Sequence, residues 1–155
     1  MKKKVSIARA LKEKNRVAGQ LAAIRKIISN ENSLGQNTSR SADISAMYEE
    51  EKKVDSKLVS IKTAIAIANV KIVNKIIELD EIKSRIAWIC KINADEGIKY
   101  ENATYHSSGY EVKYDAVLSK AFLREEEELL KKRADELQDE IDEYNAITYV
   151  EIEFD

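Results

Sequence analysis

The sequence predicts a mainly α-helical protein: an antiparallel bundle of long helices with coiled-coil-like seams and a small β element near the C-terminus. The clearest support is a run of apolar residues that recurs in steps of three and four from Ile44 to Ile72, the spacing of one helix face. Composition agrees, because proline is absent, glycine occurs 4 times and 35% of the 155 residues are charged. A chain of this length fits one domain, so we expect 1–155 to form a single helical domain.

The first helix is expected from about Ser6 to Ser29, where apolar residues again share one helical face. Residues 30–41 are mostly Asn, Ser, Gly, Gln and Thr, which predicts a mobile loop because so little apolar surface could be buried there. Ser41 or Asp43 is a suitable N-cap for the second helix.

Residues 69–74 fit a turn, a short strand or a continuous helix, and we expect an irregular link. A third helix follows with an apolar stripe from Ile76 to Asn93, and Gly97 is expected as its C-terminal stop. We expect the second and third helices to pack on each other through their apolar stripes.

Helical periodicity disappears in 97–115, a Tyr-rich segment that we expect to be irregular apart from a short strand at 110–114. The last helix is expected from about 119 to 145. Residues 147–154 alternate apolar and polar side chains, the period of a strand. This C-terminal strand needs a partner, which could be 110–114, 70–73 or the same strand of another subunit.

Charge argues against two classes of partner. The formal net charge is -2 and the pI is about 5.7, so neither nucleic acid nor an anionic membrane is an expected partner. The most apolar window, 58–77, contains Lys62, Lys71 and Lys75, and a charge at a bilayer centre costs about 2.5 to 3.5 kcal/mol. Cys90 is the only cysteine, so an intrachain disulfide is impossible and the cytoplasm is the expected location.

Charge is also distributed unevenly along the chain. Residues 1–28 contain nine Lys or Arg and one Glu, whereas residues 124–155 contain four basic and thirteen acidic residues. We expect the two ends to attract each other, with the first helix near the last one in the same subunit or a neighbour.

No constellation of residues predicts catalysis. His106 is the only histidine, and without a second His or Cys a zinc site is not expected. Ser107 and Ser108 lack the glycine-flanked turn of a hydrolase nucleophile. The sequence therefore predicts no enzyme, no metal site and no cofactor.

The Tyr-rich segment is the best candidate for a binding site. Tyrosine rings can stack on a base, with about 1 to 3 kcal/mol gained for each base, and nearby cations could bind an anion. We favour another interpretation, in which these rings pack on the bundle or on a symmetry mate, since tyrosine is common at interfaces. The candidate ligand-binding residues are Tyr100, Tyr105, His106, Tyr110, Lys113, Arg85 and Arg124, with Lys99 as a further cation.

A family resemblance adds to this interpretation. The residues that carry it are dispersed along the chain: 8–11, Arg25, 27–30, Asn69, 79–86, 110–113, Leu137, Ile141 and Asn145. In these positions the chain resembles the septicolysin-like family of small bacterial and phage proteins. The resemblance implies a helical, oligomeric protein with a small β element, and it supplies no catalytic residues.

Together these observations predict a non-enzymatic helical protein of bacterial or phage origin that self-assembles as a homo-oligomer. We expect it in the cytoplasm, which is the host cytoplasm if it is phage-encoded, or in a virion. The alternative is a phage-type anti-defence protein that sequesters a small anionic, nucleotide-like signal at a Tyr-rich subunit interface.

Overall fold

The computed structural model describes residues 2–101 and 109–154, and helical residues make up 68% of it. Where the sequence predicted one helical domain, contacts along the chain fall into two compact units, a first unit of Met1–Val73 with Ile141–Asp155 and a second unit of Asn74–Glu140. Along the chain the elements are β1 (Lys2–Ser6), α1 (Ile7–Glu31), α2 (Ile44–Ala68), the 3-10 helix η1 (Asn69–Ile72), α3 (Val73–Ile89), β2 (Gly97–Glu101), β3 (Tyr110–Tyr114), α4 (Lys120–Ile147) and β4 (Tyr149–Glu153). The mainly helical prediction is thus confirmed.

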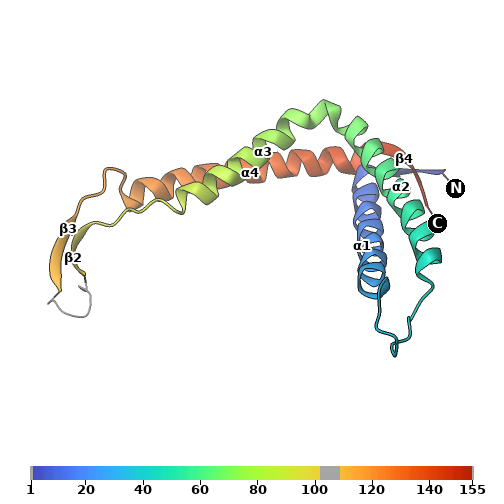
Figure 1. Cartoon of the computed structure of the whole chain (residues 1–155). Helices are drawn as coiled ribbons and strands as arrows, with labels where there is room; N and C mark the ends of the chain where they lie inside the picture. Colours follow the sequence, from blue (N-terminus) through green and yellow to red (C-terminus); the bar gives the residue numbers. More distant parts are fainter. Residues whose placement is uncertain (1, 102–108, 155) are drawn as a thin grey trace. The chain divides into compact units, whose positions relative to one another are not determined.

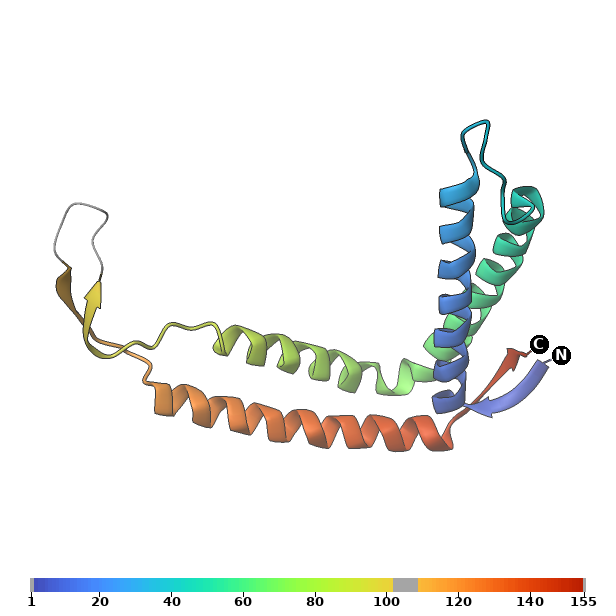
Figure 2. The same ribbon diagram turned by 90° about the horizontal axis from the view of Figure 1, so that it is seen from below.

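The first unit is built on an antiparallel pair of helices, α1 and α2, which lie side by side in Figure 1 and again in Figure 2. Each begins at a capping side chain, as expected of short polar residues before a helix. The Ser6 hydroxyl accepts a hydrogen bond from the backbone N–H of Arg9 at 3.3 Å, and the Asp43 carboxylate accepts one from Ala46 at 3.1 Å. The predicted loop lies between these helices, with its first residues still in α1.

The core of the first unit forms where the apolar stripes of α1 and α2 meet. The predicted stripe of the second helix is buried there, but against α1, so the expected packing on the third helix was wrong. The Tyr144 hydroxyl, from the last turns of α4, donates to the carbonyl oxygen of Ala68 at 2.8 Å. The buried members of this core are Val5, Ile7, Ala10, Val17, Leu21, Ile24, Val54, Leu58, Ile61, Ile65, Val150 and Ile152.

The C-terminal strand β4 pairs with β1, which was not among the expected partners. The pairing is antiparallel, with Lys4 opposite Glu151 and Val5 opposite Val150. Alternation puts Val5, Val150 and Ile152 on the buried face of this small sheet. Basic and acidic residues of the two chain ends therefore lie opposite each other in these paired strands, while the expected contact of the first helix with the last helix of the same or a neighbouring subunit stays a prediction.

The link at 69–74 is helical rather than irregular: η1 follows α2 directly, and α3 follows η1. In the second unit α3 runs antiparallel to α4 (Figure 2). Three ion pairs span these helices: Lys75 with Glu140, Arg133 with Glu78 at 2.8 Å, and Arg85 with Glu126 at 3.8 Å. Their order fixes the antiparallel register of the pair.

The segment expected to be irregular, 97–115, contains a β-hairpin. Strand β3 coincides with the strand predicted at 110–114, and β2 is its antiparallel partner. Gly97 does not stop a helix, because α3 ends at Ile89. Gly97 has a φ of 87°, a left-handed conformation that glycine adopts without a steric cost, and it starts β2. A small apolar cluster of Ile89, Ala94 and Leu123 closes the helix pair next to this hairpin.

Candidate interaction surface

The hairpin of β2 and β3 is the most exposed regular element of the second unit. No side chain of these two strands is buried among those that the structure describes. Large apolar side chains are nevertheless present, with Ile98 63%, Tyr100 74% and Tyr110 56% exposed. Because an isolated two-stranded hairpin is at best marginally stable in water, these strands are candidates for contact with another protein surface.

Strand alternation divides the hairpin side chains between two faces. The pairing places Tyr100 opposite Glu111 and Ile98 opposite Lys113 on one face. The Tyr100 hydroxyl donates a hydrogen bond to the Glu111 carboxylate, which raises the pKa of Tyr100 because ionising the phenol would place two negative charges together. The other face carries Lys99, Tyr110, Val112 and Tyr114.

The base of the hairpin is held by charged contacts with Asp95. Its carboxylate lies 2.6 Å from the Lys99 ammonium and 4.0 Å from that of Lys120. The hydrogen bond from Lys99 is the main reason that the pKa of Asp95 is lowered. Lys99 also lies over the ring of Tyr114, 5.7 Å from its centroid. These contacts connect both strands to the start of α4.

Exposed apolar residues continue beyond β3 into the start of α4. Val117 is 98% exposed, and Leu118 and Phe122 are also exposed. Ile98 and Tyr100 lie on one face of the hairpin and Tyr110 on the other, so exposed apolar side chains are available for contact with a partner on both faces. We call the set Ile98, Tyr100, Tyr110, Val117, Leu118 and Phe122 the apolar end surface.

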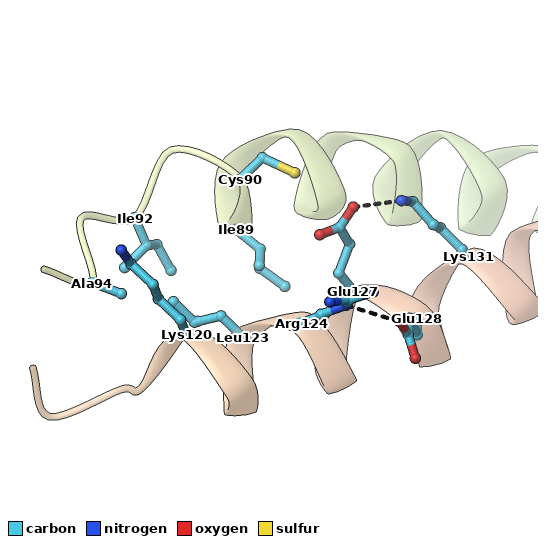
Figure 3. A pocket seen from close by; sticks show the side chains of 10 residues that line it. All are labelled: Ile89, Cys90, Ile92, Ala94, Lys120, Leu123, Arg124, Glu127, Glu128 and Lys131. Atoms are coloured by element: carbon cyan, nitrogen blue, oxygen red, sulfur yellow. Dashed lines mark hydrogen bonds and ion pairs between the residues drawn. The ribbon is translucent and has the colours of Figure 1, made fainter. Parts of the chain in front are cut away.

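A hollow of about 400 Å³ between α3 and α4 is the second candidate binding site (Figure 3). It is lined by Ile89, Cys90, Ile92, Ala94, Lys120, Leu123, Arg124, Glu127, Glu128 and Lys131.

The cations of this hollow are largely neutralised. Lys131 lies 2.5 Å from Glu127 and, as its main hydrogen-bond partner, lowers the pKa of that carboxyl. Arg124 lies 3.3 Å from Glu128, and both pairs are drawn in Figure 3. The hollow therefore has a mixed character and offers an anion no concentrated positive charge.

The structure brings together only part of the predicted ligand-binding set. Tyr100, Tyr110 and Lys113 lie on the hairpin. Arg124 lines the hollow, and Arg85 pairs with Glu126 on the facing helix. Tyr105 and His106 lie outside the described residues.

The sequence did not predict several residues that position the hairpin or lie on it. Ile98 and Glu111 alternate correctly with their strand neighbours, but five-residue strands give a weak periodic signal. Asp95 precedes the hairpin in a polar stretch and had no sequence signal of its own.

Neither a metal site nor a membrane span is found in the part of the chain that the structure describes. Within 2–101 and 109–154 no three His, Cys, Asp or Glu side chains are grouped so that they could hold a metal ion. Over the same residues, no helix combines the length and the apolar character needed to cross a bilayer. Comparison with known proteins found no matching family model, curated protein or solved structure.

Proposed function

We propose that this chain is a non-enzymatic protein that self-assembles through the apolar end surface. The observation that carries the proposal is the hairpin of β2 and β3, which has exposed apolar side chains and no buried one among those described. Covering such strands with a second copy would remove apolar area from water, which gains roughly 25 cal/mol for each Å². It would also supply the packing that a lone hairpin lacks.

The helix pair of the second unit supports a rod-like role in such an assembly. We propose that α3 and α4 form a coiled-coil-like seam, with Leu79, Ile89 and Leu123 buried along the pair. The flanking pairs of Arg133 with Glu78 and of Arg85 with Glu126 resemble the charges that border coiled-coil seams. A seam of this kind would make the helix pair rigid and so fix the position of the hairpin at its end.

Self-assembly predicts a molar mass in solution that is a multiple of 17.6 kDa. Replacing Ile98 and Tyr110 together with serine is expected to shift the mass towards a single chain at the same concentration, because it removes two exposed apolar contacts. Multi-angle light scattering coupled to size exclusion measures this shift.

The matched control replaces Val59 and Tyr48 with serine, an aliphatic and a tyrosine that are similarly exposed in the first unit. This control should keep the wild-type mass. A wild-type protein that is monomeric at micromolar concentration would reject the proposal.

The alternative is a small anionic, nucleotide-like ligand bound between subunits. Tyr100 and Lys113 share one face of the hairpin, whereas Tyr110 lies on the other, so a ligand enclosed by two copies would stack on Tyr100, with Lys113 as the cation of the same face. Native mass spectrometry of protein purified from infected and uninfected cells would reveal a retained small molecule. Protein that carries no added mass in either preparation would argue against this alternative. The septicolysin-like resemblance and the phage or bacterial origin stay predictions.

A further inference from the structure

Among the described residues, strand β3 has a neighbouring strand along one of its two edges. The sheet that contains it has only the two strands β2 and β3 among the described residues, in that order, so one side of β3 has no neighbouring strand. Unpaired strand edges readily pair with a strand of another chain. Glu111 and Lys113 are exposed on this strand.

The sequence of β3 is symmetric in character about its central residue. It reads Tyr110, Glu111, Val112, Lys113, Tyr114, so that a tyrosine lies at each end and opposite charges lie on either side of Val112. A strand of this kind is complementary to an antiparallel copy of itself.

We propose that β3 pairs antiparallel with β3 of a second copy, across a two-fold axis at Val112, to form a four-stranded sheet. This inference rests on the proposed self-assembly and specifies its geometry. A two-fold interface is self-complementary by definition, since each contact occurs twice. In this register Glu111 lies opposite Lys113 of the partner subunit, and Lys113 lies opposite the partner's Glu111.

The two faces of the four-stranded sheet would then differ in chemistry. Directly opposed side chains in an antiparallel pair share a face. The face with the charge pairs therefore also carries Tyr100, whose hydroxyl already contacts Glu111. The other face would place Val112 opposite Val112 of the partner subunit, and Tyr110 opposite the partner's Tyr114. Val112 and Tyr114 are only half-buried within one chain, so this face gains an apolar cluster from both copies.

Neighbouring registers are less favourable. A shift of two positions along β3 would place either Glu111 opposite Glu111 of the partner subunit or Lys113 opposite the partner's Lys113, and like charges directly opposed are destabilising. A shift of one position would place Glu111 opposite the partner's Val112 and lose both charge pairs. The outer edge of β2, centred on its middle residue, would oppose two copies of Lys99. The edge of β3 in the symmetric register is thus the preferred contact.

Reversing the charge of Glu111 or of Lys113, each in a separate variant, tests the proposal. Glu111→Lys and Lys113→Glu should each weaken self-association by about tenfold, because each variant opposes like charges at two positions. An equimolar mixture of the two variants should associate as a heterodimer with affinity close to that of the wild type. The measurement is analytical ultracentrifugation with one variant labelled. The matched control pair, Glu96→Lys and Lys91→Glu, changes exposed charges of the same unit and should show no preference for the mixture.

Cross-linking provides a test that does not depend on charge. Residues on the two-fold axis of an antiparallel pair have Cα atoms about 4.5 to 5.5 Å apart, within the range that a disulfide bridges. In a Cys90→Ala background, Val112→Cys should form a disulfide-linked dimer under mild oxidation. Val117→Cys, at a fully exposed position outside the strand, should do so far less.

The outcomes separate this inference from the proposed function. An oligomeric protein whose variants show no heterodimer preference and no Val112→Cys cross-link would overturn the β3 pairing while self-assembly stands. A monomeric wild type would overturn both.

Discussion

Replacing Ile61 with alanine should lower the free energy of unfolding by about 3 to 4 kcal/mol, because a buried isoleucine leaves both lost apolar contacts and a cavity. Ile61 is 1% exposed and lies in the core between α1 and α2. The measurement is urea unfolding followed by far-ultraviolet circular dichroism. Protein concentration must be held constant, since assembly would couple stability to it.

Ile67→Ala is the matched control for this prediction. Ile67 lies on the same helix and is 69% exposed, so the same chemical change should alter stability by at most about 0.5 kcal/mol. If both variants lost the same free energy of unfolding, the assignment of the buried apolar stripe of α2 would be contradicted. A loss confined to Ile61 would support the packing of α2 on α1.

Apolar periodicity predicted the helices well, since each buries one stripe. The buried residues Val54, Leu58, Ile61 and Ile65 of α2 are members of the stripe visible in the sequence. Periodicity reports which face is buried but does not identify the element that covers it. For this reason α2 was wrongly expected to pack on the third helix.

Strand β1 could not be predicted from its own residues. It contains three consecutive lysines and a single buried apolar residue, Val5, so it has no alternation to detect. Its strand conformation comes from pairing with β4, where Lys4 lies opposite Glu151. The uneven charge of the two chain ends was the only sequence signal, and it was assigned to helices instead.

The candidate surface was predicted in part. The tyrosines and the strand at 110–114 were identified because aromatic residues favour strands. The partner strand β2 was missed because a helix was expected to continue to about Asn93 and to stop at Gly97. Contacts such as that of Tyr100 with Glu111 depend on hairpin register, which five-residue strands alone do not specify.

Replacing Glu13 with glutamine should lower the free energy of unfolding by about 2 to 3 kcal/mol at neutral pH, because it removes a buried negative charge that binds Arg16 and lies close to Lys57. Glu13 is only 8% exposed. Its two carboxylate oxygens accept hydrogen bonds from the Arg16 guanidinium at 2.8 and 2.9 Å. The ammonium of Lys57, on α2, lies 3.5 Å away, and that side chain is 14% exposed. Arg16 is half-exposed, so solvent screens part of its interaction.

The loss of unfolding free energy caused by Glu13→Gln should depend on pH. The hydrogen bonds from Arg16 are the main reason that the pKa of Glu13 is lowered below 4.5 in the folded chain. A lowered pKa stabilises the fold while the carboxyl is ionised, so the contribution is complete well above pH 4.5 and disappears as the pH falls through the folded pKa. Urea unfolding at decreasing pH should therefore show that the difference in free energy of unfolding between wild type and Glu13→Gln disappears under acid conditions. Glu50→Gln, at an exposed position of α2, should match the wild type throughout. A gap for Glu13→Gln that stays constant with pH would mean that shape, rather than the ionised carboxylate between α1 and α2, stabilises this contact.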